Sequence, residues 1–156
     1  MKYRASELSD LEKSKEGLVL VEVHQGRSIL LVEEDNEVAM SVNLQLELDG
    51  FKVDMFTDPA TALDKYNKDP SGYSLVIVDT KMVRMPTFEF MRAIKIADGN
   101  SKILLITPFE IRSNEFSKVL PASKVNGFVE RPHLSTRLIT SVKDVLGDPY
   151  GDNLKQ

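Results

Sequence analysis

Leu75-Val76-Ile77-Val78-Asp79 is the stretch of sequence that decides the fold. Its four consecutive apolar residues predict a strand that is buried on both faces, as in a parallel sheet covered by helices. Asp79 follows directly, so its carboxylate is expected at the carboxyl end of that strand. Open α/β sheets bind their ligands at this edge. The stretch therefore predicts both the type of sheet and the place of a polar site.

A second apolar run, residues 29–32, ends in the acidic cluster Glu33-Glu34-Asp35. If the two strands are neighbours, their carboxylates converge on one point. Unpaired carboxylates would repel one another and some would stay protonated, whereas a divalent cation with oxygen ligands would resolve the conflict. Asp35 could instead cap the helix that follows, where acidic residues are favoured by the helix dipole. The sequence leaves both interpretations open.

Strand and helix patterns alternate five times from Arg27 onward, which indicates a parallel sheet with helices on both faces. Two strands carry charged or polar residues and are expected at the edges, whereas the other three are continuous apolar runs. We therefore predict an α/β fold, a flavodoxin-like doubly wound five-stranded parallel sheet in the order 2-1-3-4-5. The strands are predicted at residues 28–32, 52–56, 75–78, 102–106 and 125–129, and the helices at 36–49, from 59, from 86, at 110–120 and from 135 to 146.

The chain divides into three parts. Residues 1–26 form an N-terminal extension, residues 27–147 the domain, and residues 148–156 a C-terminal tail. Within the extension, Leu18–Val23 is apolar except for Glu22. It predicts an extra strand, or a contact with a helix or another molecule, because its apolar side chains would be costly to leave in water.

Composition excludes several classes of function. The net charge of −4, from 20 basic and 24 acidic residues without a dominant Lys/Arg cluster, argues against nucleic-acid binding. No apolar run approaches the roughly 18 residues of a membrane span, and the chain begins without an apolar signal core. We therefore expect a cytoplasmic protein without membrane contact. The absence of cysteine excludes disulfides, a thiolate nucleophile and cysteine metal sites.

Four motifs occur in order along the chain: SILLVEEDNEV, LVIVDTKM, ILLIT and GFVERP. Over about residues 28–147 the sequence resembles the receiver domain of two-component response regulators, in an atypical form. The resemblance implies that Asp79 is the phosphoacceptor, which takes a phosphoryl group from a sensor histidine kinase. It also implies that Glu34, Asp79 and the backbone carbonyl of Lys81 bind Mg²⁺, with Glu33 behind them.

The same resemblance assigns three further residues. Thr107 would hydrogen-bond a phosphoryl oxygen and act as a switch residue together with Phe128. Arg131 stands where the family keeps a lysine that pairs with the phosphoryl group. Because a guanidinium is planar and always charged, we expect Arg131 to pair with Asp79 before any phosphate arrives. The chain has Glu33-Glu34 where the family usually has Asp-Asp, and the longer side chains predict weaker Mg²⁺ binding.

The resemblance predicts a stand-alone response regulator receiver, a phosphoprotein of signal transduction that is not an enzyme. Its output partner is unidentified and would be reached by protein–protein contact; a homodimer is left open. One alternative is a degenerate pseudo-receiver that binds proteins without phosphorylation. A less favoured one is an aspartyl phosphatase of the haloacid dehalogenase type, which needs a second acid where this chain has Lys81. Nucleotide binding is disfavoured, since no Gly-rich phosphate loop is present.

Overall fold

The computed structural model describes residues 26–108 and 125–147. Strands and helices alternate along most of this part of the chain. In order they are β1 (Ser28–Val32), α3 (Asn36–Leu48), β2 (Val53–Phe56), α4 (Pro59–Lys68), the 3₁₀ turn η1 (Pro70–Gly72), β3 (Tyr73–Asp79), α5 (Thr87–Ala97), β4 (Ile103–Thr107), β5 (Gly127–Glu130), the 3₁₀ turn η2 (Arg131–His133) and α7 (Leu134–Leu146).

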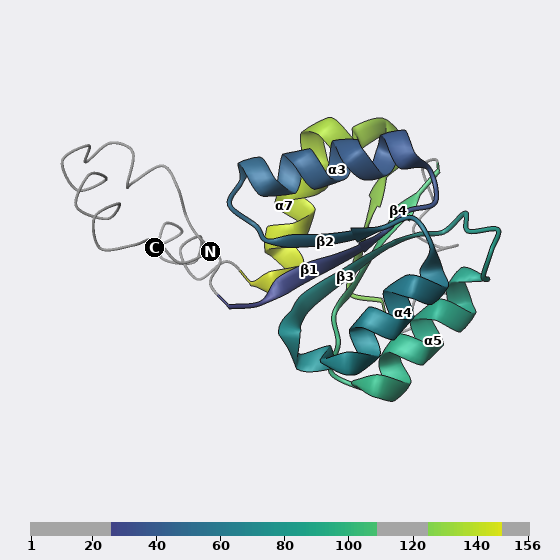
Figure 1. The fold of residues 1–156 in the computed structure, drawn as a ribbon. Helices are drawn as coiled ribbons and strands as arrows, with labels where there is room; N and C mark the ends of the chain where they lie inside the picture. The colour runs from purple at the N-terminus through teal and green to yellow at the C-terminus, as the bar shows by residue number, and fades with distance from the viewer. Residues whose placement is uncertain (1–25, 109–124, 148–156) are drawn as a thin grey trace, which may run out of the picture.

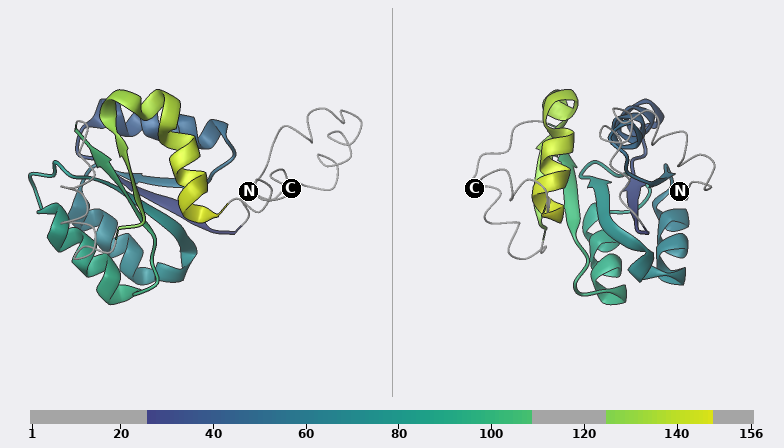
Figure 2. Two further views of the ribbon diagram at one scale, coloured as in Figure 1. Left: turned by 180° about the vertical axis from the view of Figure 1, so that it is seen from behind. Right: turned by 90° about the vertical axis from the view of Figure 1, so that its left-hand side faces the viewer.

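The strands form one parallel sheet in the order β2-β1-β3-β4-β5. α3 and α7 cover one face, and α4 and α5 cover the other (Figures 1 and 2). Successive side chains of a strand point to opposite faces, so β1 contributes to two cores. Ile29 and Leu31 pack with Val42 beneath α3 and α7, whereas Leu30 and Val32 pack on the side of α4 and α5.

The predicted fold class and strand order are confirmed, with β2 and β5 at the edges. β1 has the predicted bounds, whereas the other four strands differ from the prediction by one or two residues at their ends. The largest differences are at the starts of β3 and β5. β3 begins at Tyr73 because Tyr73 pairs with Ser28 of β1. β5 begins only at Gly127, and the Asn126 side chain before it accepts a hydrogen bond from the Ile103 N–H at 2.9 Å. The helix predicted at 110–120, the extension up to residue 25 and the tail at 148–156 lie outside the described residues.

The strand register aligns the carboxyl ends along one edge of the sheet. The outermost Cα partners are Val32 with Val78, Asp79 with Ile106, and Thr107 with Glu130. Asp79 and Thr107 therefore end neighbouring strands, while Glu33 and Arg131 directly follow β1 and β5. The fold thus gathers residues that are far apart in sequence at one place.

Gly127 marks the close approach of α7 to β5. A Cβ atom at this position would lie 2.9 Å from Val145 Cγ2 and 3.3 Å from Leu104 Cδ1. Both distances are tighter than ordinary van der Waals contact, so an added methyl group would push the helix away from the sheet.

We predict that Gly127→Ala lowers the free energy of unfolding by about 1–3 kcal/mol, the usual cost of overpacking a core. Urea denaturation measures it. Adding Val145→Ala should recover part of the loss. Gly99→Ala is the matched control, because its nearest neighbour, the Lys95 carbonyl oxygen, is 3.9 Å away. Equal losses in the two alanine variants would contradict the close approach.

Candidate functional site

Three charged side chains meet at the carboxyl edge of the sheet. Asp79 and Glu33 are buried, with 0% and 1% of their surfaces exposed. Arg131 donates from Nε to Asp79 Oδ2 at 3.2 Å and also from Nη2 to the same oxygen. Its Nη2 lies 3.4 Å from both carboxylate oxygens of Glu33. The guanidinium therefore lies between the two buried acids, and the expected pairing of Arg131 with Asp79 is present.

The two acids differ in protonation. Burial, together with a hydrogen bond to Asp79, raises the pKa of Glu33 to about 8. Burial alone would also raise the pKa of Asp79. Its hydrogen bonds with Glu33, the Lys81 N–H and Arg131 outweigh that effect and hold the pKa below the ordinary value. Near neutral pH, Glu33 thus keeps a proton while Asp79 is ionised. One guanidinium is then enough to balance the site.

Glu34 points to a different partner. Its Oε1 accepts a hydrogen bond from the Val83 N–H at 2.6 Å, and its Oε2 accepts one from the Arg84 N–H at 2.8 Å. Both amides belong to the loop between β3 and α5. The resemblance assigns Glu34 to a metal, but in this structure both its oxygens hold the loop.

The acidic cluster also starts a helix, as the alternative interpretation expected. Asp35 is the N-cap of α3, where its Oδ1 accepts from the Glu37 and Val38 N–H groups at 3.0 and 3.2 Å. The Asp35 N–H in turn donates to Glu33 Oε1 at 2.9 Å. The three consecutive acids therefore serve three separate purposes: a buried carboxyl group, a loop contact and a helix cap.

The remaining predicted residues lie just after β3, on β4 and on β5. The Lys81 N–H donates to Asp79 Oδ1 at 2.6 Å, so the described contact of Lys81 is its amide. Thr107 is fully buried at the end of β4. Phe128 on β5 is partly buried against the core under α4 and α5. The sequence did not predict one contact of Asp79, in which Thr87 Oγ1 donates to the Asp79 carbonyl at 2.9 Å. The only signal for it in the sequence is the place of Thr87 after Pro86, at the start of α5.

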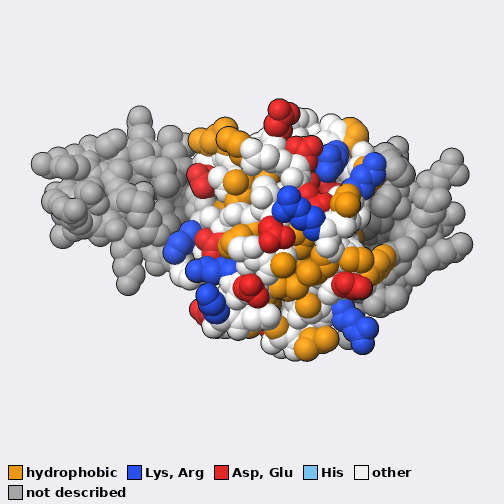
Figure 3. Space-filling model, turned by 45° about the vertical axis from the view of Figure 1, so that its right-hand side comes forward, with side chains coloured by type: hydrophobic (Ala, Val, Ile, Leu, Met, Phe, Trp, Pro, Cys, Tyr) orange, Lys and Arg blue, Asp and Glu red, His pale blue; other side chains and the backbone are white. Residues whose placement is uncertain are grey.

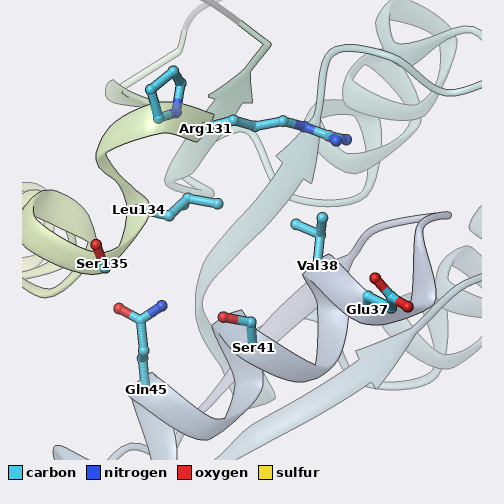
Figure 4. Close-up of a pocket in the computed structure, with 8 residues that line it drawn as sticks. Glu37, Val38, Ser41, Gln45, Arg131, Leu134 and Ser135 are labelled. Carbon is cyan, nitrogen blue, oxygen red and sulfur yellow. The ribbon is translucent and has the colours of Figure 1, made fainter.

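A groove of about 320 Å³ lies beside this site, between α3 and α7. Arg131 forms one end of it, and Figure 4 shows its side chain extending past Val38 with the guanidinium at the far end. Glu37, Ser41 and Gln45 give the α3 side a polar lining. The stem of Arg131 thus links the groove with the acidic site.

The model of the response regulator receiver domain family matches residues 29–143. The chain belongs to this family. The receiver CpdR of Brucella abortus is 32% identical over 83 residues, which are 53% of this chain and 68% of that protein. The chain spans between 34% and 68% of the curated relatives it matches, among them regulators described as transcriptional.

Solved receivers share the fold. The chemotaxis protein CheY4 of Vibrio cholerae superposes with a TM-score of 0.68 at 24% identity, covering 77% of this chain and 98% of that one. The response regulator TrrA of Thermotoga maritima, solved with Mg²⁺ and BeF, gives a TM-score of 0.65 at 22% identity over 77% of this chain and 99% of that one. The receiver family typically carries Mg²⁺ at its phosphorylation site.

The arrangement in this receiver does not fit that ion. Within residues 26–108 and 125–147, no three acidic or histidine side chains come close enough to hold a metal. Glu34 is turned to the loop amides, and Arg131 already lies between Glu33 and Asp79. Mg²⁺ demands near-ideal octahedral geometry from oxygen ligands. The guanidinium fills the space between the two acids and already compensates the negative charge of Asp79. It therefore leaves neither the room nor the uncompensated carboxylate charge that would attract the ion.

Helix length and surface composition bear on the kind of partner this chain could meet. None of the helices in the described part of the chain has the length and apolar character needed to cross a membrane. On the face shown in Figure 3, described acidic and basic side chains are interspersed among hydrophobic ones. That face therefore offers a mixed surface to a partner.

We predict that Glu34→Ala loosens the loop between β3 and α5. The Val83 and Arg84 amides should exchange hydrogen faster by about ten- to hundredfold, since each loses a hydrogen bond to a charged group worth about 1.5–3 kcal/mol. Site-resolved hydrogen exchange measures it. Glu37→Ala, at an exposed position on α3, is the control and should leave both amides unchanged. Equal exchange rates in the wild type and Glu34→Ala would refute the loop contact.

Proposed function

We propose that this receiver acts through protein–protein contacts, with its acidic site neutralised by its own Arg131 in place of Mg²⁺. The observation that carries the proposal is the ion pair between Arg131 and the buried Asp79. Two nitrogens of the guanidinium donate to one carboxylate oxygen. The site then has a stable arrangement that requires neither a metal nor a phosphoryl group.

The strength of this pair follows from its burial. Exposed salt bridges contribute about 0–1 kcal/mol, but only 28% of the Arg131 side chain and none of the Asp79 side chain is exposed. Removing one partner of a buried pair typically costs about 3–5 kcal/mol, because the other charge is left uncompensated. A phosphodonor would have to displace the guanidinium from the carboxylate before Asp79 could attack. The pair therefore opposes phosphorylation.

A second candidate function is the phosphorylation cycle that the family resemblance implies. It is supported by the lowered pKa of Asp79, because phosphoryl transfer to a carboxylate needs the ionised form. In this reading Asp79 takes the phosphoryl group from a phosphohistidine of a sensor histidine kinase. Thr107 hydrogen-bonds a phosphoryl oxygen, and Arg131 moves from the carboxylate to the new phosphoryl group. Receivers are in general signalling modules rather than enzymes, and both candidates agree with that.

One experiment separates the candidates. We expect wild-type protein incubated with acetyl phosphate and Mg²⁺ to keep its mass, because Arg131 blocks the carboxylate. Arg131→Lys should gain one phosphoryl group, since lysine lacks the planar fork that clamps Asp79. Intact-mass spectrometry measures the mass of both proteins after the incubation.

Asp79→Asn in the Arg131→Lys background is the control and should abolish the gain in mass. Phosphorylation of the wild type as fast as that of Arg131→Lys would overturn the first candidate and support the second. Failure of both to react would show that Arg131 is not the barrier.

A further inference from the structure

α3 is apolar on both sides. Its inner side packs on the sheet through Ala39, Val42 and Leu46. Its outer side carries Met40, Leu44 and Leu48, whose exposed fractions are 57%, 56% and 79%. These three residues are four apart, so they form one stripe on the helix surface. We call it the outer stripe of α3.

The outer stripe gathers much of the exposed apolar surface of the described residues. It supplies three of the six large hydrophobic side chains that are exposed among the described residues. A surface helix normally keeps polar residues on the side opposite its core. Contiguous exposed apolar surface commonly marks an interaction site. The helix therefore has the pattern of an element that lies between two layers, of which the sheet is one.

We propose that the second layer is the segment Leu18–Val23 of the same chain. This segment has apolar residues at five of six positions. Read as an extended chain, it places Val19, Val21 and Val23 on one side, over roughly 13 Å. The outer stripe runs from residue 40 to residue 48, a rise of roughly 12 Å along the helix axis. The two apolar surfaces thus match in length.

The chain connection permits this contact. Ile29 at the start of β1 donates to the Lys52 carbonyl at 2.8 Å, and Phe51 donates to the Leu46 carbonyl at 3.0 Å. The start of β1 and the end of α3 therefore lie at the same edge of the sheet (Figure 1). The seven residues from Val21 to Ser28 can span roughly 23–25 Å, more than the roughly 10–12 Å diameter of a helix. Gly26, with φ of 90°, provides a bend just before β1.

A second copy of the chain is the less suitable occupant. Stable interfaces bury about 800 Å² on each partner, whereas the outer stripe is only three side chains long. A segment tethered by a few residues is instead present at an effective concentration in the millimolar range. α3 also forms one wall of the groove beside Arg131. The segment would thus brace the helix that borders the acidic site, whatever the state of Asp79.

Disulfide trapping tests the contact directly, because the chain has no cysteine of its own. The full-length double variant Val21→Cys/Leu44→Cys should form an intramolecular disulfide under mild oxidation. The control pair Val21→Cys/Ile96→Cys places the second thiol on α5, on the other side of the sheet, where Ile96 is 77% exposed. Equal trapping in both pairs, or a disulfide only between molecules, would overturn the proposal.

Hydrogen exchange provides a test without cysteines. Residues 18–23 should be protected in the wild-type protein, and Leu44→Glu should speed their exchange by about tenfold, the effect of losing one buried leucine contact. Leu44 is exposed in the described structure, so the variant should still fold. Ile96→Glu should change nothing in this segment. Free exchange of residues 18–23 in the wild type, or protection that survives Leu44→Glu, would refute the contact.

Discussion

The ion pair between Arg131 and Asp79 is the interaction on which the rest of the site depends. Asp79 ends a central strand and has no contact with solvent. An ionised carboxylate in such a place costs several kcal/mol unless a positive charge compensates it. Two cations could do so at the edge of a receiver sheet, a metal ion or a side chain. In this chain a guanidinium from the turn after β5 takes that place.

The state of the residues around Asp79 agrees with a guanidinium in this place. With a single positive charge available, only one of the two buried acids is ionised, and Glu33 keeps its proton. Glu34, for its part, accepts hydrogen bonds from the Val83 and Arg84 amides and so fixes the loop after β3. Arg131 also reaches back along the groove between α3 and α7. The same side chain therefore connects the acidic site to a surface where a partner could bind.

The fold was predictable because its signals are local. Continuous apolar runs mark buried parallel strands, and charged or polar residues mark the edges, which leaves few possible orders. Which residues lie at the carboxyl edge was predictable too, because the carboxyl ends of parallel strands meet at one edge of the sheet. Asp79, Thr107 and Arg131 are brought there by the strand order alone.

The directions of some side chains were not predictable. Glu33 and Glu34 are adjacent acids with the same chemistry, yet one is buried against Arg131 and the other holds a loop 49 residues away. That difference depends on where the loop amides lie in space, which no local pattern contains. The contact of Thr87 with the end of β3 was missed for the same reason. The exposure of the outer stripe of α3 likewise emerges only when the helix is placed on the sheet.

The most direct test of the internal cation is the response of stability to Mg²⁺ in the absence of any phosphodonor. A ligand that binds only the folded state raises the unfolding midpoint in proportion to its affinity. Thermal unfolding of the wild type should be unchanged by millimolar Mg²⁺ relative to a matched ionic strength of NaCl. Arg131→Lys should be stabilised by the same addition, because its smaller head leaves room for the ion. An equal rise in midpoint for the two proteins would show that Mg²⁺ binds beside Arg131, and would contradict the claim that the guanidinium takes the place of the metal.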